Sequence, residues 1–145
     1  MLKRKTPLKA KAPMARKPIK QRRRKAQSAK QKDVRWRSEQ YLAFVRSLPC
    51  SVCGATEGVA AHHITGMYQL SGMGLKPADS FAMPACDPIY KHNRDCHQQI
   101  HANKALRDMQ PTFLRTTLRA GLKQFTGETA EALMHALAFL EAQQQ

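Results

Sequence analysis

The sequence predicts a small α+β domain that is braced by a structural zinc ion and follows a disordered basic arm. Of the 25 Lys and Arg residues, 14 lie within residues 1–32, where no acidic residue occurs. In the remaining chain, two short apolar runs lie among helix-forming segments, a pattern that indicates a small sheet flanked by helices. The same part contains four cysteines, two of them in the spacing Cys50-x2-Cys53 that is typical of zinc sites.

The positive charge of the chain is concentrated in the arm. The 145 residues carry a formal net charge of +15, of which residues 1–32 contribute +14 and residues 33–145 contribute +1. The arm has too little apolar surface to offset the entropy of ordering it. We expect it to bind nucleic acid rather than to be only a solvated charge run, and an anionic membrane is a weaker rival because no regular apolar face is present. The residues expected to contact DNA are Lys3, Arg4, Lys5, Lys9, Lys11, Arg16, Lys17, Lys20, Arg22, Arg23, Arg24 and Lys25, with Lys76 in the following domain.

The apolar residues of the sequence exclude two classes of protein. No stretch approaches the roughly 18 consecutive apolar residues that a membrane span requires. The basic N-terminus is not followed by the apolar stretch of a signal peptide. We therefore expect a soluble, monomeric protein of the bacterial cytoplasm, from the host or from a prophage, without a membrane partner. Thiols stay reduced in that compartment, which favours metal binding over disulfides.

The first predicted element is an amphipathic helix from Asp33 to Leu48. Val34, Tyr41 and Val45 lie near one helical face, and Asp33 is available as its N-cap. Pro49 stops this helix.

Two extended segments are expected next, from Val59 to Ile64 and from Phe81 to Pro84, with a glycine-containing loop between them. The polar stretch after them becomes helical by about Asp95. Two further helices are expected, near Thr112–Leu122 and Glu128–Ala142. The last of them places Leu133, Met134, Leu137 and Leu140 on a stripe that we expect to pack in the core, with Thr126 and Glu128 at its N-terminus.

The four cysteines are the expected structural zinc ligands: Cys50, Cys53, Cys86 and Cys96. A tetrahedral zinc site needs four such ligands, and the Cys50-x2-Cys53 turn supplies two of them. The second pair is less regular, because nine residues separate Cys86 from Cys96. His92, in that interval, is the alternate fourth ligand, and four buried thiols without metal are the remaining alternative.

Five of the six histidines lie between positions 62 and 101, and only His135 stands apart, as an expected helix-surface residue. His97 and His101 are four residues apart in a helical stretch and so share one face of the helix. Together with a histidine of the His62-His63 pair, they would form a three-histidine site that leaves positions open for water and substrate. Such open coordination is typical of a catalytic metal rather than a structural one.

These motifs carry a family resemblance that covers about residues 48–104. The series Cys50-x2-Cys53, Ala61-His62-His63-Ile64, Asp79 to Pro84, Cys86, Cys96-His97 and His101 resembles the HNH endonucleases, whose fold is the ββα-metal (His-Me finger) motif. More narrowly, His62 to Gly66, the loop Gly72 to Lys76, and Asp79 followed by Pro84-Ala85-Cys86 resemble the phage recombination-enhancement (Ref) nucleases. In that family a basic disordered N-terminus also precedes the nuclease domain, and activity depends on the RecA filament.

The resemblance implies a metal-dependent DNA endonuclease that hydrolyses phosphodiester bonds, in phage-type recombination with RecA as a possible partner. It implies that His62, His97 and His101 bind a catalytic Mg²⁺, Mn²⁺ or Zn²⁺ ion and that His63 is the general base. The asparagine that names HNH proteins has no clean counterpart here. Asp79 or Ser80 lies near its place, and Asp79 either hydrogen-bonds a strand or the base imidazole or is only a turn residue. A non-enzymatic zinc-binding module for DNA or RNA is the alternative function.

Overall fold

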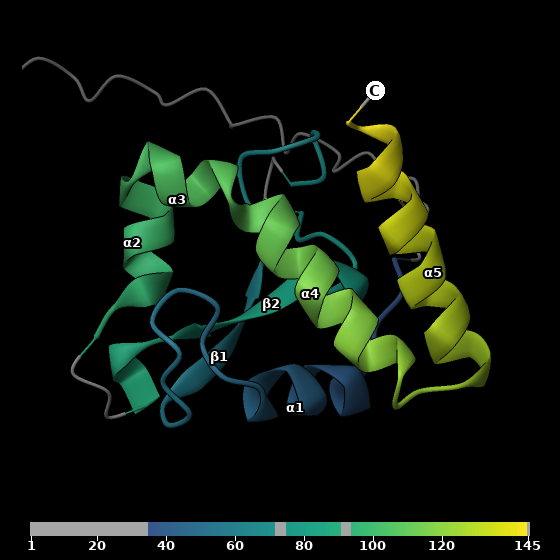
Figure 1. The fold of residues 1–145 in the computed structure, drawn as a ribbon, viewed down its shortest axis with the longest axis horizontal. Coiled ribbons are helices and arrows are strands. Elements are labelled where there is room, and N and C mark those ends of the chain that lie inside the picture. The colour runs from purple at the N-terminus through teal and green to yellow at the C-terminus, as the bar shows by residue number, and fades with distance from the viewer. Residues whose placement is uncertain (1–34, 72–74, 91–93, 145) are drawn as a thin grey trace, which may run out of the picture. The chain divides into compact units, whose positions relative to one another are not determined.

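The computed structural model describes residues 35–71, 75–90 and 94–144 (Figure 1). The expected basic arm, Asp33 and the alternate zinc ligand His92 lie outside these residues. The described elements, in chain order, are α1 (Glu39–Ser47), β1 (Val59–His63), the 3-10 helix η1 (Asp79–Phe81), β2 (Ala82–Cys86), the 3-10 helix η2 (Pro88–Tyr90), α2 (Cys96–Ala102), α3 (Lys104–Asp108), α4 (Gln110–Leu122) and α5 (Gly127–Ala142). The described part is therefore α+β, as the sequence predicts.

The sheet is an antiparallel pair of strands, β1 and β2. Its register places His62 opposite Met83 and His63 opposite Ala82. All five residues of β2 are buried, whereas β1 alternates toward its end, with His62 buried and His63 partly exposed. Because neighbouring side chains on a strand point to opposite faces, the two histidines meet different surroundings.

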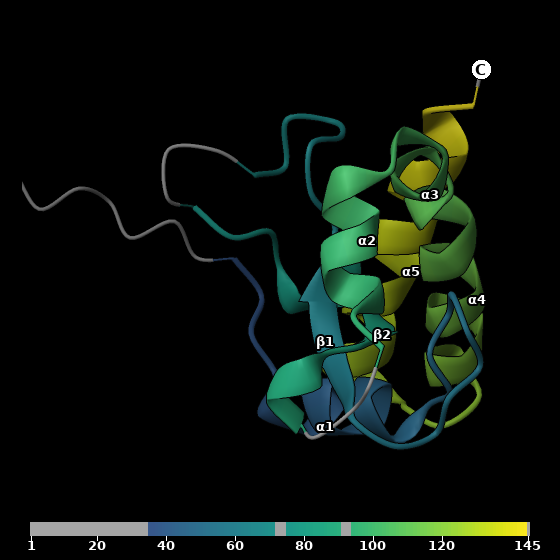
Figure 2. The same ribbon diagram turned by 90° about the vertical axis from the view of Figure 1, so that its left-hand side faces the viewer.

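The helices enclose this hairpin. Figure 1 shows α4 crossing in front of the strands with α5 beside it, and the turned view of Figure 2 shows both helices on the same side of β1. α1 packs against both strands, and α2 follows β2 and packs against it. The resulting core consists of buried residues from α1, the hairpin and α2, α4 and α5: Tyr41, Val45, Ile64, Met83, Ala85, Ile100, Leu114, Leu118, Leu133, Ala136 and Leu140.

The first helix is shorter than expected. α1 begins at Glu39 because the Ser38 side chain caps it by accepting from the Tyr41 N–H. Residues 35–38 are not helical. Arg35 donates to the carbonyls of Leu70 and Lys76, and Arg37 donates to the carbonyl of Pro77. The prediction of a helix through residues 35–38 was therefore wrong, since these tertiary hydrogen bonds tie the segment to distant parts of the chain and Ser38 is extended.

Two further details differ from the sequence expectations. The short helix α3 was not expected, and the Asn103 side chain caps it by accepting from the Ala105 N–H. Met134 was expected in the core stripe of α5, but it is 50% exposed, while Leu133 and Leu140 are fully buried. Only part of the predicted stripe faces the core, because α5 turns Leu133 inward and leaves Met134, the next residue, on its outer side.

No helix in the described ranges is long and apolar enough to cross a membrane.

Candidate metal centre

Three histidines converge from β1 and α2. His62 lies 4.6 Å from His97 and 5.2 Å from His101, measured between ring centroids, and the rings of His97 and His101 are 5.3 Å apart. One ring nitrogen from each residue can be chosen so that the three atoms lie within 4.8 Å of one another. His62 is buried, His97 is partly buried and His101 is exposed, so the cluster opens toward solvent on one side. Three convergent imidazoles are a donor set that suits a divalent ion of the zinc type.

The helix α2 brings two of these ligands together because of its spacing and its cap. The Asp95 side chain accepts from the Gln98 N–H and so caps α2, which begins at the next residue, Cys96. Four residues correspond to about one helical turn, so His97 and His101 project from the same face. Cys96 and Ile100, one position earlier in each turn, are buried instead.

The electrostatic surroundings keep two of the imidazoles neutral. Burial, reinforced by the neighbouring His97, lowers the pKa of His62 to about 4. Burial likewise lowers the pKa of His101, with contributions from His97 and from the guanidinium of Arg107. A neutral imidazole has a lone pair available for metal, so at neutral pH these two ligands do not need to lose a proton first.

The four cysteines form a second cluster, beside the first. One sulfur from each of Cys50, Cys53, Cys86 and Cys96 lies within 4.8 Å of the others. Their thiols are free, and the sulfurs of Cys53 and Cys86 are 3.7 Å apart. A tetrahedron with Zn–S bonds of about 2.3 Å has S–S edges of about 3.8 Å. The donor set and its spacing therefore fit a structural zinc ion.

The turn that carries the first two cysteines is closed by backbone hydrogen bonds. The Gly54 N–H donates to the Cys50 carbonyl, and the Cys50 N–H donates to the Ala55 carbonyl. Gly54 has a φ of +74°, in the left-handed region that glycine adopts without strain. The Cys86 N–H also points at the Cys50 sulfur, at 3.4 Å, which is the kind of contact that stabilises a thiolate.

His63 lies at the end of β1 and contacts a buried carboxylate. Its Nε2 atom is 2.9 Å from Oδ1 of Asp79, whose side chain is 6% exposed. The same carboxylate accepts from Arg37, at 2.8 Å, and from the Ser38 N–H, at 2.9 Å. Burial alone would raise the pKa of Asp79, but the hydrogen bonds from His63, Ser38 and Arg37 hold it below its ordinary value. Asp79 is therefore an ionised acceptor that holds one nitrogen of His63.

Two further polar residues contact histidines of the cluster through hydrogen bonds. Nδ1 of His97 is 2.9 Å from Oδ2 of Asp87, which follows Cys86 directly in the chain. Nε2 of His62 is 3.3 Å from Oε1 of Gln110, the first residue of α4, whose side chain is completely buried. A hydrogen bond from the Ile89 N–H, with that of His97, holds the pKa of Asp87 below its ordinary value.

All four of the site's histidines line one cavity of about 280 Å³. It is bordered by Ala61, His62, His63, Thr65, Ser71, Leu75, Lys76, Pro77, His97 and His101. His62 and His63 thus serve the same cavity even though they point to opposite faces of the strand, because β1 ends at His63. The exposed Lys76 adds a positive charge to its edge.

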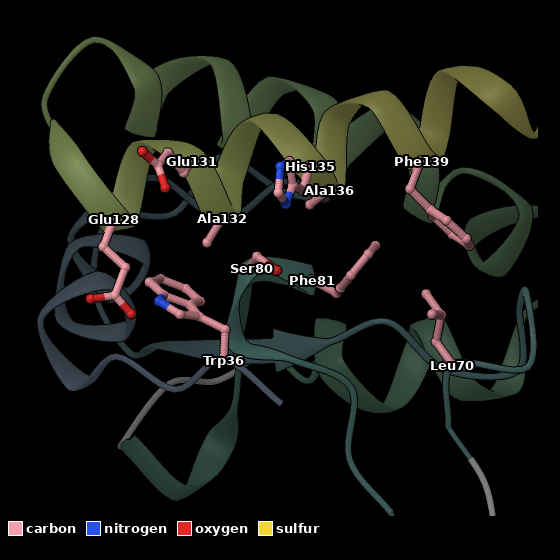
Figure 3. Close-up of a pocket in the computed structure, with 10 residues that line it drawn as sticks. All are labelled: Trp36, Leu70, Ser80, Phe81, Glu128, Glu131, Ala132, His135, Ala136 and Phe139. Carbon is pink, nitrogen blue, oxygen red and sulfur yellow. The ribbon is translucent and has the colours of Figure 1, made fainter. Parts of the chain in front are cut away.

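A larger cavity, of about 460 Å³, lies between α5 and the segments around Trp36 and Phe81 (Figure 3). Its walls carry two carboxylates, Glu128 and Glu131, near Trp36, and His135 farther along α5. It shares none of its lining residues with the histidine cavity. Carboxylates repel phosphate, so this acidic cavity is a poor candidate for contact with nucleic acid.

The predicted site residues are thus gathered in two clusters, one of thiols and one of imidazoles, with His63 and Asp79 at the edge of the second. Cys96 completes the thiol cluster in the described structure. The contacts of Arg37, Asp87 and Gln110 were missed. Asp87 could have been suspected because it directly follows a predicted zinc ligand, but no local pattern in the sequence connects Arg37 or Gln110 with residues 42 and 48 positions away.

Comparisons with known proteins identify the family of the chain but indicate no activity for it. A family model described as a protein of unknown function, DUF968, matches residues 8–123. The chain is also similar to an uncharacterized protein, YdfU, of Escherichia coli (strain K12), at 38% identity over 63 residues. That match covers 43% of this chain and 17% of YdfU, so the chain corresponds to only a small part of the length of this relative. No solved structure matches the chain.

Proposed function

The chain belongs to the DUF968 family of proteins of unknown function, and we propose that it is a metal-dependent DNA endonuclease of the HNH type. The observation that carries the proposal is the convergence of His62, His97 and His101 beside a fourth histidine that a buried carboxylate holds. Phosphodiester hydrolysis needs an activated water and neutralisation of the charge that develops on the phosphate. This arrangement contains groups for both tasks. The order of β1, β2 and α2 also supports the ββα-metal comparison.

In this proposal His63 is the general base. Asp79 engages its Nε2 atom, so Nδ1 is the nitrogen that accepts a proton from the attacking water. The water oxygen then forms a bond to phosphorus, and the bond between phosphorus and the leaving 3′ oxygen breaks, with its electron pair on the 3′ oxygen, which takes a proton from solvent water. Asp79 keeps the ring in one tautomer and stabilises the protonated imidazole that results.

His62, His97 and His101 would hold the catalytic ion, and the four cysteines would hold structural zinc. A divalent ion at the three imidazoles would supply Lewis-acid stabilisation of the negative charge on the scissile phosphate. An ion held by these imidazoles would be accessible to water and substrate from the cavity, because His101 is exposed and the three histidines line that cavity. Lys76, at the cavity edge, would contact a neighbouring phosphate of the DNA backbone.

The basic arm supports DNA as the substrate. The domain after it is nearly neutral, so most of the long-range attraction for a polyanion comes from residues 1–32. We propose further that the protein acts on DNA during phage-type recombination and that a RecA filament is the partner that presents the substrate.

The experiment that tests the nuclease compares cleavage by wild type, His63→Ala and His135→Ala. Labelled single strands, duplexes and displacement loops are incubated with Mg²⁺, Mn²⁺ or Zn²⁺, with and without RecA and ATP. We expect His63→Ala to lower the cleavage rate by roughly 10²- to 10⁴-fold, and His135→Ala, on the exposed face of α5, to leave it unchanged. Equal rates for the two variants, with equal zinc contents, would contradict the assigned base.

Metal stoichiometry separates the nuclease from the alternative, a zinc module without catalytic activity. The nuclease predicts one zinc ion that resists chelation, at the thiols, and a second ion that exchanges readily, at the open histidine cluster. A purely structural module predicts that both ions resist chelation and that no condition yields cleavage. Inductively coupled plasma emission spectroscopy measures the number of metal ions that remain bound per chain after treatment with increasing concentrations of EDTA.

A further inference from the structure

The side-chain amide of Gln110 is held in one orientation by four contacts with three residues. Its Nε2 group donates to the carbonyls of Thr65 and Arg107, each at 3.0 Å. Its Oε1 atom accepts from the Thr65 N–H at 3.1 Å. Exchanging the two ends of the amide would place oxygen against two carbonyls and NH₂ against an N–H, so the exchanged orientation is excluded.

The fourth contact of this amide is with His62. Since Oε1 can only accept, the His62 Nε2 atom that lies 3.3 Å from it forms a favourable contact only when it carries the proton. The side chain of His62 is buried, so a lone pair facing the amide oxygen would be repelled with no water to relieve it. This leaves the lone pair of the neutral ring on Nδ1.

In His97 the hydrogen-bond partner faces the other ring nitrogen, Nδ1. The carboxylate of Asp87 faces its Nδ1 at 2.9 Å, and an ionised carboxylate only accepts hydrogen bonds. The Asp87 side chain is itself fixed, because its Oδ1 accepts from the Ile89 N–H at 3.0 Å and the Asp87 N–H donates to the Gly58 carbonyl. The proton of the neutral His97 ring is therefore on Nδ1, and the lone pair is on Nε2.

We propose that Gln110 and Asp87 hold His62 and His97 in opposite tautomers, so that the ion is bound through Nδ1 of His62 and Nε2 of His97. Both are positioning residues, because each acts through a histidine and neither contacts the ion. The inference rests on the metal-binding part of the proposed function and is independent of whether DNA is cleaved. It also links the two clusters, since Asp87 directly follows Cys86 and His97 directly follows Cys96.

The tautomers are measured directly by long-range ¹H–¹⁵N correlation spectra of the full chain, labelled with ¹⁵N-histidine and loaded with zinc at the thiols only. Spectra of His62→Gln and His97→Gln assign the two rings. We expect the proton on Nε2 of His62 and on Nδ1 of His97, and the resonances of the opposite nitrogens to shift when a second equivalent of Zn²⁺ is added. A proton on Nδ1 of His62, or a Zn²⁺-dependent shift of its Nε2, would overturn the assignment.

Metal affinity gives a second measurement, with a matched pair of substitutions. In Asp87→Asn the amide can donate to Nδ1 of His97, which favours the tautomer with a protonated Nε2. We expect this variant to bind Co²⁺ at the histidines roughly 10- to 100-fold more weakly than wild type, as is usual when the partner of a metal-bound histidine is lost. Asp108→Asn makes the same chemical change on the exposed side of α3 and serves as the control. Equal Co²⁺ affinities for the two variants would overturn the role of Asp87.

Gln110→Met tests the partner of His62. The variant keeps the size of the side chain but removes the acceptor, so we expect a mixture of His62 tautomers and weaker Co²⁺ binding. A single, unchanged tautomer in a folded Gln110→Met protein would overturn the role of Gln110. If this variant fails to fold, the wild-type spectra still decide the proposal. A wild-type protein with the expected tautomers that cleaves no DNA would support this inference and contradict the proposed nuclease.

Discussion

Asp79 Oδ1 lies 2.9 Å from Nε2 of His63, and the two residues stand at opposite ends of the connection between β1 and β2. Asp79 begins η1, the 3-10 helix just before β2, and His63 is the last residue of β1. Arg37 donates to the same oxygen, and the Ser38 N–H donates to the other carboxylate oxygen, Oδ2. The segment before α1 therefore contributes to the orientation of a residue in the candidate active site.

The first prediction concerns Asp79 and catalysis. In Asp79→Ala the ring of His63 loses its partner, so we expect the cleavage rate to fall by roughly 10- to 10³-fold while the zinc content stays the same. Asp79→Asn should restore part of the rate, because an amide oxygen can still accept from Nε2. Steady-state cleavage of a labelled oligonucleotide measures both effects. Wild-type rates in Asp79→Ala would limit this carboxylate to a structural role.

The second prediction concerns Asp79 and stability. Because folding lowers the pKa of this carboxyl, its contribution to stability is present above its unfolded pKa, near 3.9, and is lost as the pH falls through the lower folded value. Asp79→Asn should destabilise the domain by about 1 to 3 kcal/mol at pH 7. The difference from wild type should shrink below about pH 4. Urea unfolding at several pH values measures it, and a difference that is constant down to pH 2 would contradict the prediction.

The third prediction concerns zinc and folding. In a core of this size, metal bound at four thiols is part of the folding free energy. Cys53→Ala should lower the free energy of unfolding by more than about 3 kcal/mol or prevent folding. Ser51→Ala, in the same turn, is the matched control, because the hydrogen bond that Ser51 makes to the Pro84 carbonyl comes from its backbone N–H, which alanine keeps. Circular dichroism with and without chelator measures both variants, and equal melting of the two would argue against structural zinc.

The fourth prediction concerns Gly121, where α4 meets α1 and α5. A Cβ atom at this position would lie 2.8 Å from Cδ1 of Leu133 and 3.2 Å from Cε2 of Tyr41, both of which are fully buried. Gly121→Ala should destabilise the domain by about 1 to 3 kcal/mol, although alanine is the better helix former. Thermal melts against Thr116→Ala, on the exposed side of the same helix, provide the comparison. A more stable Gly121→Ala protein would show that the three helices can separate at no cost.

The fifth prediction concerns the arm. If about half of its 14 positive charges contact phosphate, the logarithm of DNA affinity should fall with the logarithm of salt concentration with a slope of about −5 to −6. Deletion of residues 1–32 should flatten this slope strongly and leave the zinc content unchanged. Fluorescence anisotropy over a range of salt concentrations measures the slope. A slope that survives deletion would assign DNA binding to the nearly neutral domain.

Local patterns were sufficient for several elements of the fold. The apolar run at residues 59–64 predicts β1, and the spacing after Pro111 predicts α4 and α5 closely. Local patterns failed where distant contacts decide the outcome. Residues 35–38 have helix-forming composition, yet the hydrogen bonds of Arg35 and Arg37 to a segment about 40 residues away hold them out of the helix.

By itself, the sequence determined the chemical content of the protein: the separated basic arm, the four thiols and the paired histidines. Ligand chemistry depends on residue type, and two of the spacings, Cys50-x2-Cys53 and His97-x3-His101, bring their members together within one turn of chain. Only the tertiary structure decided which atoms face one another across long separations. Gln110 meets His62 because α4 packs on the hairpin, and Asp79 meets both Arg37 and His63 because three segments end at one place. Such contacts follow from the packing of whole elements, which no local pattern encodes.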